Sequence, residues 1–293
     1  MKTDILRSAA ALLTLAVAVT GQAWGQGSSA ASVLERGKVL MEGIVACGNC
    51  HQARDDRGRM VRDKGLSGGM VFVEPPFRAV AANITPDAAT GIGKWSDAQL
   101  AKAIREGIRP DGSLIGPPMP VEFYRHLSDA DLAAIVAYLR AQPPVSNAVP
   151  KSVYRMALPP AYGPPIQSVA PPPAGDAVAT GEYLARIGHC MACHTPRTAD
   201  GSLVMEQIGA GGTQFPGPWG LSVSRNLTPH DSGLKGWSDD EIARAIRTGV
   251  SRDGSKLRPP MGYAYSRNIG DADMAALIAY LRSLKPLAFA GKN

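Results

Sequence analysis

The chain has 293 residues, of which 45% are hydrophobic and 19% are charged, and its formal net charge is +6. This length suits two domains of about 110 residues each after a leader sequence. The basic charge does not indicate nucleic-acid binding, because no run of Lys and Arg is interleaved with aromatic residues. We interpret it as a solvated surface.

Residues 1–25 have the pattern of a secretory signal peptide. Lys2 and Arg7 give a positive start, residues 9–19 form an apolar core, and residues 21–25 supply small side chains for cleavage. An uncleaved anchor is the alternative, but the apolar run is short for crossing a bilayer. We expect export to the periplasm by a cleaved signal peptide, with membrane contact only through a partner.

Three helices are predicted in the first half of the chain. The first spans 32–46, where apolar residues follow helical spacing. The second begins with a capping box at Ser96, and the third runs over 128–141 and ends before Pro143. Long stretches rich in Gly and Pro separate these helices. Such loops are unusual in a compact domain unless they wrap a large flat cofactor.

Residues 142–177 form a proline-rich segment that holds ten of the 24 prolines. This composition favours extended polyproline structure, and we expect a strap that spaces two domains and packs along a surface. Beyond it the same helices are predicted again. They cover 178–188, a second capping box at Ser238, and 271–284.

The two halves can be superposed at a shift of 143 residues, which becomes 142 after one deletion. Matches over such a length indicate a duplicated domain rather than a short-period solenoid. The matched segments are Cys47–His51 with Cys190–His194, Asn83–Pro86 with Asn226–Pro229, Trp95–Asp97 with Trp237–Asp239, Asp111–Ser113 with Asp253–Ser255, Pro117–Met119 with Pro259–Met261, and Ala137–Arg140 with Ala279–Arg282.

All four cysteines lie in two Cys-x-x-Cys-His motifs. This pattern attaches c-type haem: two thiols bond covalently to the porphyrin and the adjacent histidine reaches the iron. The sequence therefore predicts two haem c groups, held covalently by the four thiols and on the iron by the two histidines. The predicted residues are Cys47, Cys50, Cys190 and Cys193, with His51 and His194.

Paired cysteines have three other common uses. A zinc site would need two further ligands near each pair, and no other cysteines exist. A thioredoxin-like pair would sit in a βαβ pattern with β-branched strands, which the sequence lacks. A disulfide framework is possible with four cysteines, but it does not explain a histidine directly after each pair. The haem interpretation is therefore preferred.

Methionine is a common second axial ligand of haem iron. Met119 and Met261 occupy matching positions in the two halves, each after two prolines that fix the backbone. Core packing is the ordinary role of methionine, but only this pair is matched in a rigid loop. We predict both as axial ligands, which would leave each iron six-coordinate and closed to substrate.

Other candidate residues carry weaker signals. We interpret the remaining histidines as surface or packing residues, because they have no counterparts in the other half. Two tryptophans either donate an indole N–H to a haem propionate or staple the start of the next helix. Two arginines either neutralise haem propionates or, being on a helix, are solvated, and we expect the second. These residues are His126, His189, His230, Trp95, Trp237, Arg105 and Arg247.

The expected fold is all-α, with two tandem class I cytochrome c-like domains, each wrapped around one covalent haem. The predicted boundaries are a signal peptide over 1–25, a first domain over 26–141, the proline-rich linker over 142–177 and a second domain over 178–293.

On these motifs the chain resembles the cytochrome c subunit of bacterial periplasmic alcohol, gluconate and aldehyde dehydrogenases. The matching features include the Cys-x-x-Cys-His pairs, the Asn-x-Thr-Pro and Pro-Pro-Met segments, and Gly-x-Gly-Lys-Trp-Ser-Asp at 91–97. Larger members of that family carry a third haem motif and a C-terminal membrane-binding segment, which are not found here. The resemblance implies a subunit that takes electrons from a catalytic partner and hands them on.

The leading hypothesis is a dihaem cytochrome c that is not an enzyme by itself. It would transfer electrons from a periplasmic dehydrogenase to the respiratory chain, through a downstream cytochrome, quinone or oxidase. The alternative is a dihaem enzyme of the peroxidase or thiosulfate-oxidising type, which would need one open iron. A haem-bearing sensor is a third possibility, but no residues remain to build an output domain.

Overall fold

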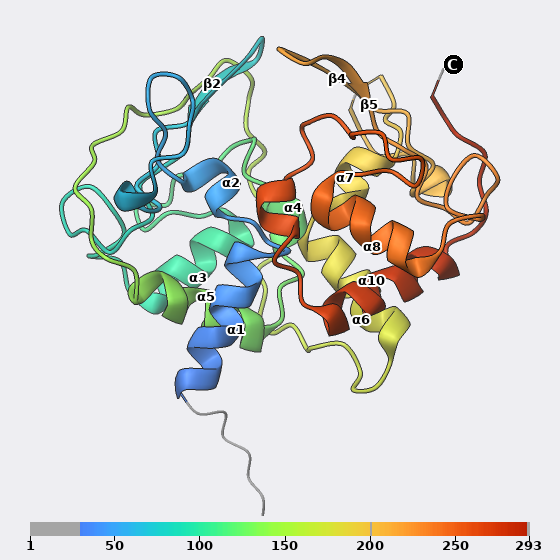
Figure 1. Ribbon diagram of the computed structural model, residues 1–293. Helices are drawn as coiled ribbons and strands as arrows, with labels where there is room; N and C mark the ends of the chain where they lie inside the picture. The colour runs from blue at the N-terminus through green and yellow to red at the C-terminus, as the bar shows by residue number, and fades with distance from the viewer. Residues whose placement is uncertain (1–29, 200, 292–293) are drawn as a thin grey trace, which may run out of the picture.

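The computed structural model describes residues 30–199 and 201–291, so the predicted signal peptide lies outside the described residues. Two similar halves lie side by side, with their long helices at one end and a β-hairpin from each half at the other (Figure 1). No helix among the described residues has the length and apolar character needed to cross a membrane.

Each half is built on a pair of packed long helices, formed by the first and the last helix of that half. In the first half α1 packs on α5, and in the second α6 packs on α10. The helices are α1 (Ala30–Glu42), α2 (Gly48–His51), α3 (Asp97–Glu106), α4 (Val121–Tyr124), α5 (Asp129–Arg140), α6 (Ala177–Ile187), α7 (Cys190–His194), α8 (Asp239–Thr248), α9 (Tyr263–Ser266) and α10 (Asp271–Ser283).

Helix starts follow local capping chemistry. Ser96 and Ser238 each form a complete capping box at the start of α3 and α8, as predicted. Ser128 accepts from the backbone N–H of Asp131 at the start of α5. The glycine at the matching position before α10, Gly270, makes no side-chain cap.

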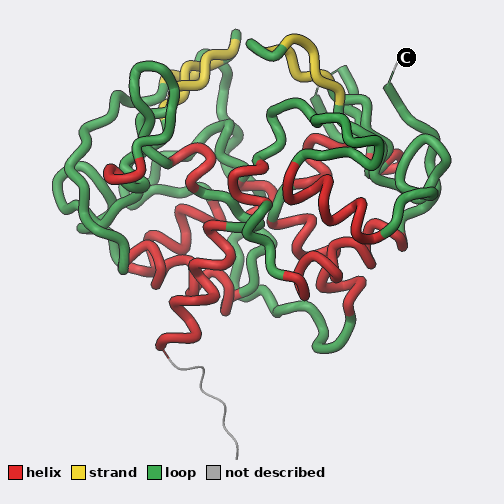
Figure 2. The backbone as a smooth tube through the Cα atoms, in the orientation of Figure 1, coloured by secondary structure: helices red, strands yellow, loops and turns green. Residues whose placement is uncertain are grey.

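The expectation of an all-α fold was wrong. The described residues contain two antiparallel sheets, and loops make up much of the chain (Figure 2). Two-residue turns at 75–76 and 218–219 close the hairpins. The strands are β1 (Val71–Glu74), β2 (Phe77–Val80) and β3 (Val153–Tyr154) in one sheet, and β4 (Gln214–Gly217) and β5 (Gly220–Val223) in the other.

The hairpins were missed because their strands are only four residues long, too short for a clear alternating pattern. Proline also occupies each turn, and a proline-rich stretch reads as a loop. Pairing across the turn nevertheless aligns Val71 with Val80 and Phe72 with Ala79. Two similar halves remain, but each combines helices, loops and one small sheet.

The proline-rich segment packs against the first half. Its residue Tyr154 pairs with Phe77 in β2, and the Tyr154 hydroxyl donates to the carbonyl of Pro117 at 3.0 Å. The Tyr162 hydroxyl donates to the carbonyl of Ile115 at 2.8 Å. This segment therefore completes the sheet of the first half and covers the loop that leads to Met119.

Candidate haem-binding sites

The cysteine motif of each half forms a one-turn helix, α2 or α7, in which the histidine is the last residue. The residue before each first cysteine has a positive φ, 52° at Ala46 and 44° at His189. This left-handed conformation turns the chain sharply between the first long helix and the motif. The same backbone geometry therefore presents the two cysteines and the histidine in both halves.

Both motif histidines are oriented by a backbone carbonyl. Nδ1 of His51 lies 2.8 Å from the oxygen of Ala82, and Nδ1 of His194 lies 2.8 Å from the oxygen of Arg225. Such a bond fixes the ring and places the proton on Nδ1, which leaves Nε2 as the free donor for a metal. Burial lowers the pKa of both imidazoles, which favours the neutral form that an iron ligand requires.

The carbonyls that orient the histidines belong to the residues directly before the Asn-x-Thr-Pro segments found in the sequence. In the first half, buried Asn83 follows Ala82, and its side chain donates to the carbonyl of Val145 in the strap at 2.8 Å. Thr85 donates to Asn83 at 2.7 Å, and the N–H of Val145 donates back to Thr85 at 3.1 Å.

The second half repeats this arrangement with residues from the end of the chain. Asn226 donates to the carbonyl of Leu287 at 2.7 Å, and the N–H of Leu287 donates to Thr228 at 3.1 Å. Each histidine is therefore held by a chain of buried hydrogen bonds that ends in an extended segment following the last helix. The Asn-x-Thr-Pro motif predicts where this loop lies in the sequence, but it does not predict the extended segment that holds the loop in place.

The thiols lie in surroundings that suppress their reactivity. Burial raises the pKa of Cys47 and of Cys190 to about 12, and burial also raises the pKa of Cys50 and Cys193. A reactive redox thiol needs the opposite shift, so a thioredoxin-like role has no support. Among the described residues, no group of three or more Cys, His, Asp or Glu side chains has the arrangement of a metal site.

A matched pair of arginines, which sequence reasoning missed, braces each motif helix. Arg54 donates to the carbonyl of Asn49 at 3.0 Å, and Arg197 donates to the carbonyl of Ala192 at 3.0 Å. Both arginines stand three residues after the motif histidine, so the repeat alignment itself would have found them. They place a permanent positive charge beside each cysteine pair.

The two predicted methionine ligands have different surroundings. Met119 is partly buried and packs against the hydrophobic core. Met261 is 37% exposed. Each follows a cis Pro-Pro bond, Pro117-Pro118 or Pro259-Pro260.

The paired arginines and tryptophans of the sequence analysis have structural roles. Arg105, expected to be solvated, is only 7% exposed; it donates to the carbonyl of Leu127 at 2.6 Å and to Asp129 at 2.7 Å. Its match, Arg247, donates to Asp271 at 2.7 Å. These arginines hold the start of the last helix of each half, α5 and α10. The tryptophans Trp95 and Trp237 pack against the core before α3 and α8, as a hydrophobic staple would.

Each motif lies beside a short helix of the other half. Phe123 and Tyr124 of α4 each pack against the ring of His189, at 6.3 Å between ring centroids. At the matching position of the second half, the Tyr265 hydroxyl lies against Gly48, between the cysteines of the first motif. Each half therefore inserts an aromatic residue beside the other half's cysteine motif, in an approximate two-fold arrangement.

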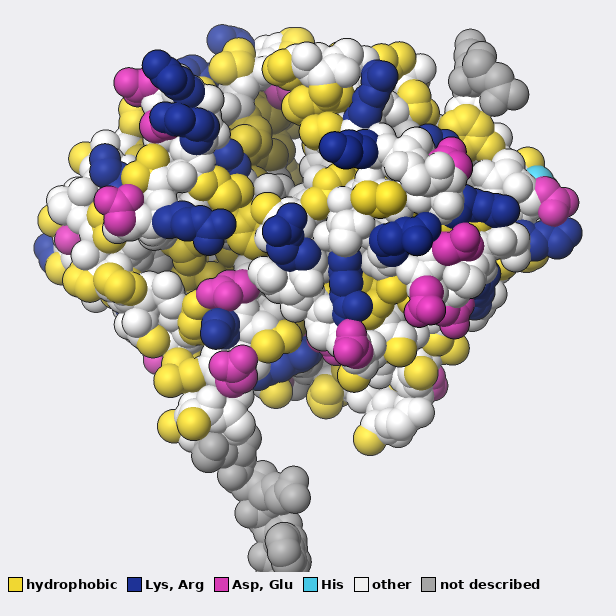
Figure 3. Space-filling view, in the orientation of Figure 1, with side chains coloured by type: hydrophobic (Ala, Val, Ile, Leu, Met, Phe, Trp, Pro, Cys, Tyr) yellow, Lys and Arg dark blue, Asp and Glu magenta, His cyan; other side chains and the backbone are white. Residues whose placement is uncertain are grey.

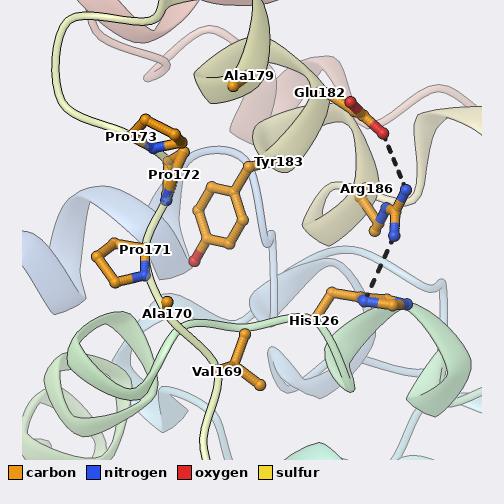
Figure 4. Close-up of a pocket in the computed structure, with 10 residues that line it drawn as sticks. All are labelled: His126, Val169, Ala170, Pro171, Pro172, Pro173, Ala179, Glu182, Tyr183 and Arg186. Carbon is orange, nitrogen blue, oxygen red and sulfur yellow. Dashed lines mark hydrogen bonds and ion pairs between the residues drawn. The ribbon is translucent and has the colours of Figure 1, made fainter.

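Polar contacts lock this arrangement. The Tyr183 hydroxyl of α6 donates to Asp131 of α5 at 2.7 Å, and Arg36 of α1 donates to the same carboxylate at 2.8 Å. A pocket beside this contact is lined by α6, His126 and prolines of the strap (Figure 4). It contains no cysteine, so it is separate from the motifs. One hydrophobic core runs through both halves.

The residues of each motif fit covalent haem attachment. Two partly buried cysteines precede a histidine whose Nδ1 is bonded to a backbone carbonyl, which leaves Nε2 for a metal, and a methionine loop lies in the same half. In the first half the fully buried Ser67 hydroxyl has no hydrogen-bond partner among the described residues. The next residue, Gly68, donates its N–H to the carbonyl of His51 at 2.8 Å, so this unsatisfied hydroxyl lies close to the first motif. The arrangement, present twice, defines a protein built to hold two c-type haems.

Comparison with known proteins agrees with this class. The model of the cytochrome c family matches residues 34–143 and again residues 178–285, so the chain belongs to the cytochrome c family. Two matched domains, together with a dihaem relative, show that the chain carries two haem c groups.

Three relatives illustrate the similarity. The chain is 33% identical to a nicotinate dehydrogenase subunit of Pseudomonas putida, over 89% of this chain and 22% of that protein. It is 32% identical to the cytochrome c subunit of a quinone alcohol dehydrogenase of Gluconacetobacter polyoxogenes, over 96% of this chain and 61% of that protein. It is also 32% identical to a diheme c-type cytochrome of Cereibacter sphaeroides, over 80% of this chain and 81% of that protein. The chain thus spans only part of the first two relatives.

Proposed function

We propose that this protein is a dihaem electron-transfer subunit that accepts electrons from a dehydrogenase and passes them towards the respiratory chain. The observation that carries the proposal is the duplicated thiol and histidine site in a chain whose relatives include cytochrome subunits of dehydrogenases. Haem c supplies a one-electron iron couple at such a site. The protein is therefore not the catalyst that oxidises the substrate.

Specific residues would hold the two haems. Cys47 and Cys50 in the first half, and their counterparts in the second, would form the thioether bonds. His51 would be the first axial ligand, and its bond to the carbonyl of Ala82 supports this role. Met119 would be the second axial ligand, a role supported by its rigid Pro-Pro-Met loop. The corresponding set in the second half is Cys190, Cys193, His194 and Met261.

The contact between the halves suits the passage of electrons between two sites. Gly48, inside the first motif, touches Tyr265 of the second half, and His189, beside the second motif, touches Tyr124 of the first half. The hydrogen bond from Tyr183 to Asp131 at 2.7 Å and the ion pair between Arg36 and Asp273 at 3.5 Å both join the first half to the second and keep them from moving apart. Contact between the halves allows transfer without a slow domain motion.

The proposal includes export and a division of the chain. Residues 1–25 would direct the protein to the periplasm and be removed, since c-type haem is attached outside the bacterial cytoplasm. The mature protein would then consist of domains at 26–141 and 178–293, joined by the segment 142–177. The two relatives named as dehydrogenase subunits support a dehydrogenase partner in that compartment.

Substrate-driven reduction of the haem tests the function. The exported holoprotein is oxidised, mixed with a membrane and periplasmic preparation of its host, and given ethanol, gluconate or nicotinate in separate reactions. We expect one substrate to produce the ferrous α-band of haem c, and no reduction when that substrate is omitted. If ascorbate reduces the protein but no dehydrogenase substrate does, the proposed partner class is wrong.

The alternative function, a peroxidase-type dihaem enzyme, predicts that one iron can bind an external ligand. Such an enzyme needs an iron with an open position, whereas both halves offer the same Pro-Pro-Met segment. Ferrous holoprotein that binds carbon monoxide at one haem would favour the enzyme. Protein that binds none would favour the electron carrier.

A further inference from the structure

The two hairpins occupy matching positions but have different edges. In the first half, β2 pairs with β1 on one side and with β3 of the strap on the other. In the second half, β5 pairs with β4, and no other strand among the described residues lies on its far side. The outer edge of β2 is therefore covered, whereas the equivalent edge of β5 is left open.

The first half shows what such an edge binds. Val153 pairs with Arg78, Tyr154 pairs with Phe77, and the N–H of Arg155 donates to the carbonyl of Pro76 at 2.8 Å. The Tyr154 ring then lies against the Pro-Pro-Met loop, so close to Gly116 that a Cβ there would be 2.6 Å from the ring. An extended segment thus covers both the strand edge and the methionine loop.

The second half has an arginine where the first has that glycine. Arg258 matches Gly116 in the repeat, and its guanidinium donates weakly to the carbonyl of Leu221 in β5 at 3.4 Å. The loop and the edge are therefore adjacent, but no segment of the described chain covers them. Leu221 is 50% exposed, Trp219 36% and Met261 37%.

The far edge of β4 is protected, whereas the edge of β5 is not. Pro216 of β4 stands opposite Leu221, and a proline has no N–H to offer to an added strand. Natural sheets use such prolines to block pairing between edges. On β5, Leu221 and Val223 keep their N–H groups, so this edge can accept a further strand.

The charge around the edge indicates the nature of the added strand. Arg225, Lys256 and Arg258 are exposed beside β5, and residues 214–223 and 256–266 contain no Asp or Glu. In the space-filling view, apolar side chains gather over the hairpins and around a hollow between the two halves, with cationic side chains nearby (Figure 3). Arginine and tryptophan are enriched at protein interfaces, and a cationic border favours an acidic partner.

We propose that an extended, acidic segment of the dehydrogenase partner docks on the second half by adding a strand to the edge of β5. There it takes the place that β3 of the strap occupies on the first half, next to the Met261 loop. Main-chain hydrogen bonds give the affinity of such β-augmentation, and side chains give its specificity. This inference rests on the proposed function, because it names the surface at which the electron-donating protein binds.

A proline substitution tests the edge. Leu221→Pro removes one outward N–H at a position whose cross-strand partner is already proline, so the hairpin itself keeps its ladder. Losing one main-chain hydrogen bond to the partner is expected to raise the KM for the cytochrome about tenfold. Reduction by ascorbate and the haem spectrum should stay as in the wild type.

A charge reversal gives a second, independent variant. Arg258→Glu places a negative charge where an acidic segment would bind, and we expect a similar rise in KM that grows at low salt. Lys102→Glu is the matched control, because it changes the net charge by the same amount. Lys102 is exposed, and it belongs to α3, which lies at the other end of the molecule. Its KM should remain within about twofold of the wild type.

The assay is substrate-driven reduction of the holoprotein by the host dehydrogenase preparation. If the wild type is not reduced, the proposed function fails and this inference fails with it. If the wild type is reduced and both Leu221→Pro and Arg258→Glu keep the wild-type KM, only the inference is wrong. It is also overturned if Leu221→Pro instead converts a dimer of this chain to a monomer, or abolishes binding to vesicles of anionic phospholipid.

Discussion

Replacing Gly181 by alanine tests the close crossing of α6 and α10, which frames the second haem-binding domain. A Cβ at position 181 would overlap the carbonyl oxygen of Ala276 and lie 2.7 Å from the Cβ of Tyr280. The obstruction is backbone, not the end of a flexible side chain, so the helices must separate. Gly37 has the same relation to Ala134 and Tyr138 in the first domain.

Two opposing effects set the size of the change. Alanine favours a helix over glycine by about 1 kcal/mol. Overpacking a well-packed contact costs about 1–3 kcal/mol, and a backbone obstruction belongs at the upper end. We therefore expect Gly181→Ala to lower the free energy of unfolding by about 2 kcal/mol, although helix propensity alone predicts a gain.

Equilibrium unfolding of the holoprotein in guanidinium chloride, followed by far-UV circular dichroism and by haem absorbance, measures the effect. Gly270→Ala is the matched control, because a Cβ there meets nothing within 4 Å and the φ is ordinary. We expect Gly270→Ala to lower the free energy of unfolding by less than about 1 kcal/mol, which is the range of a weakened N-cap. If Gly181→Ala is as stable as the wild type, the helices are not in the close contact described.

Three further substitutions test separate parts of the structure. Met119→Ala should let the ferrous protein bind carbon monoxide at one haem per chain, and an unchanged spectrum would remove Met119 as a ligand. Ser96→Ala should lower stability by about 1 kcal/mol in thermal unfolding, because it destroys the capping box of α3. Hydrogen bonds from Ser168 and from Arg105 hold the pKa of Asp129 below its usual value, so its carboxylate stabilises the fold above the unfolded-state pKa. That contribution is lost as the pH falls through the folded-state pKa, and Asp129→Asn should flatten acid unfolding in that range; an unchanged profile would contradict this.

Features set by nearby residues could be predicted from the sequence. Ser96 and Gln99 lie within one helical turn, so their capping box follows from their spacing alone. The repeat located the matched loops at Asn83 and Asn226, because identical short segments recur at one shift. Such features depend on the backbone within a few residues, and tertiary packing did not override them.

Features that depend on distant residues could not be predicted in this way. Arg105 looked like a solvated helix residue, but it is nearly buried and pairs with the exposed Asp129, 24 positions away. The contact of Tyr265 with Gly48 joins residues from different halves, and no local pattern announces it. The third strand of the first sheet comes from a segment whose prolines predicted only an extended chain.

The packing of the strap determines where this protein can be divided. A fragment that stopped at Ala141 would lack Val145, Tyr154 and Tyr162, and the side chains of Asn83 and Thr85 would lose the carbonyl of Val145 as an acceptor. The separable N-terminal unit therefore ends beyond Tyr162, well inside the stretch that looks like a spacer. The C-terminal unit begins no later than Asp176, which caps α6. Proteolytic nicking between these points would release two folded pieces only after the shared core that joins them had been opened.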